Sequence, residues 1–219
     1  MAHSIPTTVS YGKKTSPYLN FFIFVWLSIS MTKKDISPYN ALFPNPALLV
    51  TCGKIEKPNI ITIAWSSTAC LDPPMLTIAV TPSRYSYNLI VESKDFVVNI
   101  ADAKDVEKVD YCGNVSGLDI NKFKACGFSI EKSAKVNSPR IRECPINIEC
   151  YLDRTVHLGT HDLFIGQIAN VSVEEGILGK KDRPDIDGMN TLVYAQGRYF
   201  QLGKVLGQYG FSVADKGKD

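Results

Sequence analysis

Short hydrophobic runs separated by turn-forming residues recur along the chain from Asn45 onward. Runs rich in Val, Ile, Leu and Thr and bounded by Gly, Pro, Asn or Asp predict β-strands. Such strands are expected over residues 48–51, 60–65, 75–81, 96–101, 161–173 and 191–196. The alternating segment 146–152 predicts one more strand, with apolar side chains toward the core and Asn147, Glu149 and Tyr151 toward water.

Two segments carry helical signals, and one carries a loop signal. Ser83 is a candidate N-cap, followed by apolar residues at the spacing of one helix face. Residues 103–112 predict a short amphipathic helix that ends at Gly113, and the charged stretch 174–190 predicts an exposed loop. Because strands outnumber helices and do not alternate with them, we expect a mainly β fold, an antiparallel barrel with peripheral helices.

Composition narrows the class of protein. The 219 residues are 45% hydrophobic and 21% charged, which is typical of a globular protein and excludes a collagen or a coiled coil. The 24 basic and 22 acidic residues leave a formal charge of +2, too small a surplus for the concentrated basic face of a nucleic-acid binder. We expect residues 31–219 to form a single domain.

The first thirty residues differ from the rest, and their apolar run over residues 21–27 is too short to span a membrane. Met31 opens a segment that resembles an ordinary cytosolic start. We therefore interpret residues 1–30 as an over-long start or a disordered extension of a cytoplasmic protein, with an export signal as the alternative.

Six cysteines and three histidines are available for special chemistry. The cysteines show neither C-x-x-C nor zinc-ligand spacing, so no metal site is predicted. Three disulfides are formally possible, but free and mostly buried thiols are the preferred interpretation. His157 and His161 lie in a predicted strand and turn, where they do not share a helix face.

No motif of a protein-only catalyst is present. The sequence contains no G-x-G-x-x-G, phosphate loop, H-E-x-x-H or G-x-S-x-G. We therefore expect no catalytic side-chain set and assign any chemistry to a bound cofactor.

Two segments suit a flat ligand that carries a phosphate. Trp65 precedes Ser66, Ser67 and Thr68, whose small side chains let the backbone approach a ring, although on spacing alone a Ser-rich turn is the preferred interpretation. Ser83, Arg84 and Ser86 cluster at the predicted helix start, where free amides and an arginine favour an anion. Simple N-capping by Ser83 beside a solvated arginine is the alternative. On its local sequence, Lys122 is an ordinary solvated lysine.

The order of these motifs resembles the flavin reductase-like family, in its flavoredoxin and ferric-reductase branch. The likeness spans residues 38–206 and runs through NPALLVT, NIITIAW, DPP, SRYS, FVVNI, GLDINKF, HDLFIG and LVYAQGRYFQLG. It implies an FMN-binding split barrel and a homodimer with FMN near the subunit interface. Leu118 stands where many relatives carry arginine, which removes one cation from the implied site.

The resemblance also implies which residues bind the cofactor. They are Asn59, Trp65, Ser66, Ser67, Thr68, Ser83, Arg84, Ser86, Lys122, His161 and Tyr194. Ser83, Arg84, Ser86 and Lys122 are assigned to the phosphate, the backbone of residues 65–68 to the isoalloxazine, and Tyr194 to a cover over part of the ring.

The implied function is an FMN-dependent oxidoreductase. It passes electrons from a reduced nicotinamide, NADH or NADPH, or from another donor to free flavin, a ferric complex or a protein partner. A non-catalytic FMN electron carrier and a cofactor-free binding module are the alternatives.

Overall fold

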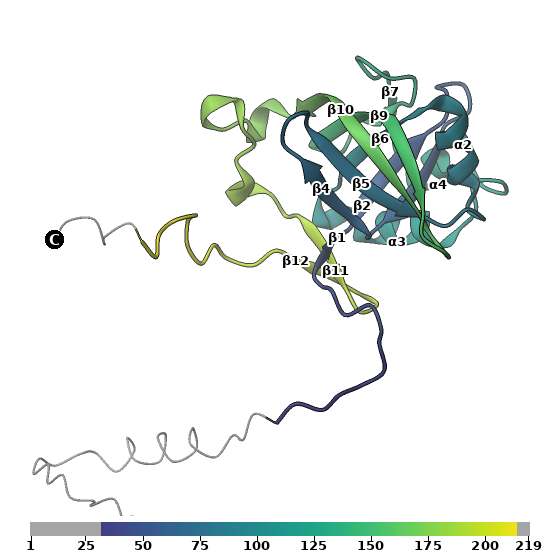
Figure 1. The fold of residues 1–219 in the computed structure, drawn as a ribbon. Coiled ribbons are helices and arrows are strands. Elements are labelled where there is room, and N and C mark those ends of the chain that lie inside the picture. Colours follow the sequence, from purple (N-terminus) through teal and green to yellow (C-terminus); the bar gives the residue numbers. More distant parts are fainter. Residues whose placement is uncertain (1–31, 214–219) are drawn as a thin grey trace, which may run out of the picture. The chain divides into compact units, whose positions relative to one another are not determined.

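The computed structural model describes residues 32–213, and its centre is a curled, seven-stranded antiparallel sheet (Figure 1). The strand order is β3-β2-β6-β9-β10-β5-β4. In chain order these strands are β2 (Leu48–Cys52), β3 (Asn59–Ile63), β4 (Ser66–Cys70), β5 (Met75–Val80), β6 (Asp95–Ile100), β9 (Ile146–His157) and β10 (Asp162–Val173). The mainly β, antiparallel prediction is confirmed.

Two smaller sheets and a few helices accompany this barrel sheet. The helices are α2 (Tyr85–Ser93), α3 (Val106–Asn114) and α4 (Lys122–Cys126), with 3-10 turns η1 (Ala103–Asp105), η2 (Glu175–Ile177), η3 (Lys180–Asp182) and η4 (Ile186–Gly188). The short strands are β1 (Asn45–Pro46), β7 (Ile130–Glu131), β8 (Arg140–Ile141), β11 (Leu192–Ala195) and β12 (Arg198–Gln201). Strands β1, β7, β8 and β12 were not predicted from the sequence.

The core has two parts because β2 and β3 are buried on both faces. Val50 and Ile61 belong to the cluster inside the curled sheet, together with Phe96. Leu49 and Ile60, their neighbours along the chain, belong to a second cluster that includes residues of α3 and α4. Successive strand residues point to opposite faces, so a strand covered on both sides is continuously hydrophobic, as the run at residues 48–52 is.

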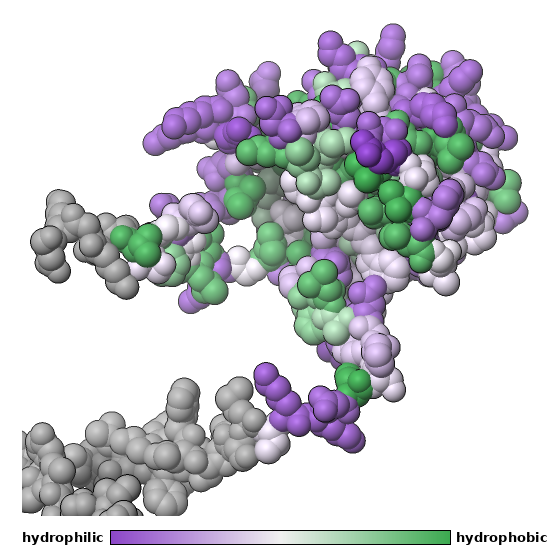
Figure 2. Space-filling model, viewed as in Figure 1, coloured by the Kyte–Doolittle hydropathy of each residue, from purple (hydrophilic) through white to green (hydrophobic). Residues whose placement is uncertain are grey.

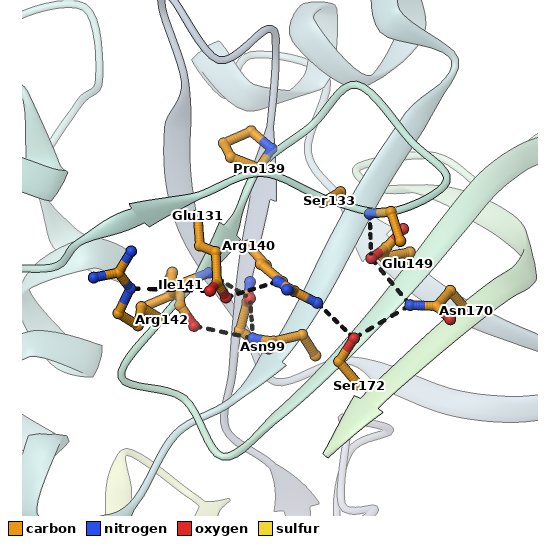
Figure 3. A network of polar contacts seen from close by, with 12 residues as sticks. Asn99, Glu131, Ser133, Pro139, Arg140, Ile141, Arg142, Glu149, Asn170 and Ser172 are labelled. Carbon is orange, nitrogen blue, oxygen red and sulfur yellow. Dashed lines mark hydrogen bonds and ion pairs between the residues drawn. The ribbon is translucent and has the colours of Figure 1, made fainter. Parts of the chain in front are cut away.

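The solvated face predicted for residues 146–152 is wrong at two of its three positions. Asn147 and Glu149 are buried, whereas Tyr151 is exposed. Residues 129–144, which we call the strap, supply polar partners to this face (Figure 3). Alternation identifies which side chains share a face, but it does not distinguish water from a hydrogen-bonding loop.

The strap supplies the Glu149 carboxylate with hydrogen-bond donors in place of water. Its carboxylate accepts hydrogen bonds from the backbone N–H groups of Ala134 and Lys135, at 2.9 and 2.7 Å, and from Asn170 Nδ2 at 3.2 Å (Figure 3). Asn147 Nδ2 donates to Asn99 Oδ1 at 2.9 Å. These polar groups are buried with partners, which is the condition for burying them at low cost.

The strap also carries an ion pair. Arg140 Nε lies 2.7 Å from Glu131 Oε2, and Arg140 Nη1 donates to Ser172 Oγ at 2.6 Å (Figure 3). These contacts join β7, β8 and β10, so the strap is fixed at its ends as well as over Glu149.

Both predicted helix boundaries are wrong in detail. The N-cap of α2 is Arg84 rather than Ser83, and no side chain caps it. Helix α3 continues through Gly113 to Asn114. A Cβ on Gly113 would lie 3.2 Å from Thr62 Cβ, so this glycine serves the close approach of α3 to β3 rather than the end of the helix.

The segment after Trp65 is a strand rather than a Ser-rich turn. Strand β4 pairs with β5 alone and forms one edge of the barrel sheet. The charged segment 174–190 consists of three 3-10 turns and short connections with mostly exposed side chains, and Figure 2 shows it as a largely hydrophilic rim. The exposed-loop prediction is confirmed.

The predictions for residues 1–30 lie outside the described residues. Within residues 32–213, no helix has the length and apolar character needed to cross a membrane.

Candidate functional site

Two adjoining cavities open where β3, α2 and α3 meet. Their volumes are about 430 and 200 Å³. Both are lined by Ile61, Arg84 and Gly113, so together they offer one elongated space with an arginine and a glycine at the junction.

The smaller cavity gathers five of the predicted cofactor-binding residues. It is lined by Asn59, Ser83, Arg84, Ser86 and Lys122, together with Ser116 and Gly117. Among the described residues that line it, none is acidic and two are cationic. The composition of this lining suits an anion.

Lys122 is the most unusual of these residues because it is 3% exposed. Its Nζ donates to the carbonyl oxygens of Ile60 and Cys112, each at 2.7 Å. An ammonium has three N–H donors, so one is left for the cavity. No carboxylate in the described part of the chain forms an ion pair with Lys122.

Burial is the main electrostatic influence on this lysine. It lowers the pKa of Lys122, and the charge of Arg84 acts in the same direction, while the thiols of Cys112 and Cys52 oppose it. A negatively charged ligand would relieve both unfavourable effects. The site is therefore electrostatically prepared for an anion.

The start of α2 supplies further anion-binding groups. Ser83, Arg84, Tyr85 and Ser86 line the smaller cavity, and Arg84 caps the helix without a side-chain hydrogen bond. The first amides of a helix have no partner within the helix, and the helix dipole favours negative charge there. This arrangement explains why the sequence contains no good capping side chain at that position.

Asn59 and Ser86 are held rigidly at the base of the smaller cavity. Asn59 Nδ2 donates to Ser86 Oγ at 2.7 Å, and both residues are buried. Gly117 packs so closely that a Cβ there would come within 2.2 Å of Asn59 Oδ1. The amide orientation is therefore fixed before any ligand binds.

The larger cavity contains two aromatic pairs. The rings of Trp65 and His161 lie 4.5 Å apart, and His161 Nε2 is 3.1 Å from Thr81 Oγ1. Tyr194 and Tyr199 meet edge to face at 5.4 Å. All five residues line this cavity, which gives it aromatic surfaces suited to a flat ring.

One buried carboxylate fixes the hairpin that carries His161. Asp162 Oδ2 accepts from Tyr87 Oη at 2.6 Å and lies 2.8 Å from His157 Nδ1. The hydrogen bond from Tyr87 is the leading cause of the lowered pKa of Asp162. Because Tyr87 belongs to α2, this contact couples the anion end of the site to the position of His161.

Ser66, Ser67 and Thr68 line neither cavity. They lie on β4, where their backbone pairs with β5, and Ser67 and Thr68 are exposed. Their assignment to the isoalloxazine stays a prediction, while the other assigned positions come together around the two cavities.

The sequence analysis missed several lining residues, notably Asp110, Asn114 and Tyr199. Asp110 and Asn114 are one helical turn apart, with Gly113 beside Asn114. Polar residues at this spacing, on a helix that carries an internal glycine, indicate a helix face that packs closely against another element or a ligand. That signal was available in the sequence.

All six cysteines are free, and five are buried, as predicted. Burial raises the pKa of Cys52 to about 12, and it also raises the pKa of Cys112, whose Sγ lies 3.6 Å from Cys126 Sγ. The thiols of Cys52 and Cys112 therefore stay protonated at neutral pH and serve packing. Within residues 32–213, no group of three His, Cys, Asp or Glu side chains is arranged for a metal ion.

Comparison with known proteins places the fold in a family. An uncharacterised protein of Archaeoglobus fulgidus is 33% identical over 157 residues, covering 72% of this chain and 87% of the relative. The flavoredoxin of Desulfovibrio vulgaris (Miyazaki F) superposes with a TM-score of 0.77 at 29% identity, over 83% of this chain and 99% of that structure. A flavoredoxin from Methanosarcina acetivorans gives 0.74 at 30% identity, over 82% and 99%. Residues 40–203 match the family described as flavin reductase like domain, and the chain therefore belongs to that family and has its split-barrel fold.

Proposed function

We propose that this chain binds FMN across the two cavities, with the phosphate in the smaller and the ring system in the larger. The observation that carries the proposal is Lys122, a buried cation that faces an open cavity with one donor to spare. A buried charge is costly unless it is paired. A phosphate at this position supplies the missing partner.

The residues that line the smaller cavity fit the phosphate of such a ligand. Lys122 and Arg84 provide charge-assisted hydrogen bonds, while Ser83 and Ser86 provide hydroxyl groups beside the amides of α2. Leu118 is 74% exposed and lines neither cavity. With leucine at this position, Lys122 and Arg84 must hold the phosphate without the extra cation that many relatives have.

The protein acts as an oxidoreductase in this proposal, and its own side chains bind and orient rather than react. When bound, FMN supplies two-electron chemistry, taking a hydride from a reduced nicotinamide or electrons from another donor and passing them on. Trp65, His161 and Tyr194 shape the space around the ring, and the buried strand residues exclude water from its inner side. Correct placement of the donor against the ring is then the main catalytic contribution of the chain.

A non-catalytic electron carrier is the second candidate, because two of the similar structures are flavoredoxins. Anaerobic mixing of the holoprotein with NADH or NADPH separates the two. Bleaching of the flavin on the time scale of turnover supports the reductase. Absence of bleaching at saturating nucleotide supports the carrier.

We further propose that the protein is a cytoplasmic homodimer with FMN near the subunit interface. Trp65 is 42% exposed although it lines the larger cavity, so a second subunit would complete the cover over the ring. Sedimentation of the holoprotein tests the dimer, and a monomer that binds FMN with full affinity would contradict it.

The phosphate assignment is tested by comparing FMN with riboflavin, which lacks the phosphate. Lys122→Met removes the charge and keeps the length of the side chain. Lys124→Met, on the exposed side of the same helix, is the matched control. Because a hydrogen bond to a charged group contributes about 1.5–3 kcal/mol, we expect Lys122→Met to weaken FMN roughly 10- to 100-fold.

Riboflavin affinity should be unchanged in Lys122→Met, and Lys124→Met should bind both ligands normally. Equal losses for FMN and riboflavin would contradict the assignment. A purified wild-type protein that shows no change in melting temperature on addition of FMN would favour the cofactor-free module instead.

A further inference from the structure

The wall of the larger cavity formed by α3 and the β11–β12 hairpin differs chemically from the rest of the site. Asp110 is the one acidic side chain among the described residues that line either cavity. Tyr199 Oη donates to Asp110 Oδ1 at 3.1 Å. This contact uses one of the two carboxylate oxygens of Asp110, a residue that lines the larger cavity.

The hydrogen bond between these two residues is maintained across the neutral range. Burial, followed by the contact with Asp110, raises the pKa of Tyr199 to about 12. The phenol therefore keeps its proton and continues to donate. Asn114 is fixed beside it, because its Nδ2 donates to the Asp110 carbonyl at 2.9 Å.

The two cavities thus have opposite electrostatic preferences. Lys122 in the smaller cavity and Arg84 at the junction attract a phosphate, whereas the carboxylate at the α3 wall of the larger cavity repels one and accepts hydrogen bonds from hydroxyl groups. A carboxylate that binds ribose hydroxyls and disfavours a 2′-phosphate is a general way to select between the two nicotinamide nucleotides.

The exposure of the residues that line the larger cavity indicates which part of a nicotinamide nucleotide contacts this wall. Asp110 and Asn114 are exposed, while Ile61, Ile63 and Val80, which line the same cavity, are buried. With the flavin ring against these buried residues, the reacting ring of a donor must approach from the open side of the cavity. Its outer half, which carries the adenosine, then lies at the rim.

We propose that Asp110 is a specificity-determining residue that accepts a hydrogen bond from the adenosine ribose of NADH and repels the 2′-phosphate of NADPH. This inference rests on the proposed FMN-dependent reductase function. It assigns Asp110 no part in binding FMN. Tyr199 is the positioning residue that orients the carboxylate.

The test is anaerobic stopped-flow reduction of the holoprotein over a range of NADH and NADPH concentrations. Like charges brought together at a recognition site are strongly unfavourable, but exposure and salt screen them. We therefore expect the wild type to prefer NADH by about tenfold in apparent Kd. Asp110→Asn should remove most of that preference, chiefly through tighter NADPH binding.

Asp119→Asn is the matched control, because Asp119 is exposed and lines neither cavity. It should leave the preference unchanged, and raising the salt concentration should reduce the preference of the wild type but not that of Asp110→Asn. Tyr199→Phe should reduce the preference only partly. Equal affinity of the wild type for both nucleotides, or equal changes for both in Asp110→Asn, would overturn the inference.

Binding of adenosine fragments to the holoprotein separates this inference from the proposed function. Calorimetry should show 5′-AMP binding more tightly than adenosine 2′,5′-bisphosphate, with the difference lost in Asp110→Asn. If both nucleotides bleach the flavin equally well, the reductase stands and the role of Asp110 fails. If neither nucleotide bleaches the flavin and neither fragment binds, the reductase and the role of Asp110 both fail, and the electron carrier is supported.

Discussion

Glu149 and Lys122 are both buried charged residues, but the protein surrounds them in different ways. The Glu149 carboxylate receives three hydrogen bonds from the strap and β10 and lines neither cavity. The Lys122 ammonium donates two and faces a cavity. A buried charge whose partners are supplied by the chain holds a structure together, and one with an unused donor at a cavity indicates a ligand.

Glu149→Gln should have the largest effect on stability. The substitution places an amide NH₂ against donors that now meet a carboxylate oxygen, and disrupting such a buried network costs about 3 kcal/mol. Urea unfolding of the apoprotein measures the loss. Glu175→Gln, at an exposed carboxylate, is the control and should unfold like the wild type.

The comparison would fail if Glu149→Gln weakened FMN binding in protein that is still folded. We expect its FMN affinity to stay within about twofold of wild type, since Glu149 lies outside both cavities. Titration under conditions where far-UV circular dichroism shows native structure provides this readout.

Lys122→Met should show the reverse of this pattern: FMN binding is weakened, while the stability of the apoprotein hardly changes. Removal of the desolvated charge is favourable, whereas the carbonyl groups of Ile60 and Cys112 lose a donor. These effects oppose each other, so we expect the free energy of unfolding to change by less than about 1 kcal/mol. A loss as large as that of Glu149→Gln would show that Lys122 is structural.

The pH dependence of stability also tests whether Lys122 is a desolvated charge in the apoprotein. Burial lowers the pKa of Lys122 below its ordinary value of 10.5, so in alkaline solution the unfolded apoprotein binds more protons than the folded one. The contribution of Lys122 to apoprotein stability should therefore rise with pH up to the ordinary lysine value. Unfolding experiments on wild type and Lys122→Met at several alkaline pH values measure this difference, and identical pH profiles would contradict the assignment.

Asp162→Asn should show its effect on stability mainly in acid solution. The lowered pKa of Asp162 means that its stabilising contribution is present above the ordinary carboxyl pKa and is lost as the pH falls through the lowered value. In the variant, this acid-dependent loss should be absent. Fluorescence of Trp65, which contacts His161, should also change, because the hairpin is no longer fixed to Tyr87; an unchanged spectrum would argue against that coupling.

The sequence predicted those strands whose residues are hydrophobic on at least one face. Strands β2 and β5, predicted over residues 48–51 and 75–81, are examples, because burial alone determines their pattern. It failed at Asn147 and Glu149, since their burial depends on a strap whose position is set by tertiary contacts. It also failed at Ser83, where the helix starts one residue later, next to a cavity that suits an anion.

The candidate site was predicted mainly through the family resemblance. Nothing local distinguishes Lys122 from a solvated lysine, because its burial arises from the packing of α4 against β3 and α3. Asp110 and Tyr199 come from α3 and β12, which are far apart in the chain, so their pairing was outside the reach of any local pattern. Ser66–Thr68 remain assigned by the resemblance alone.

Gly113 has a consequence for the size of the molecules that this site accepts. It lines both cavities, and a Cβ at this position would lie only 3.2 Å from Thr62 Cβ, closer than an ordinary van der Waals contact. A larger residue would have to displace Thr62 or α3 at the point where the two cavities adjoin. A ligand confined to one cavity would be less sensitive to that shift than one that extends through both, so a glycine at this position suits a long ligand better than a larger residue would.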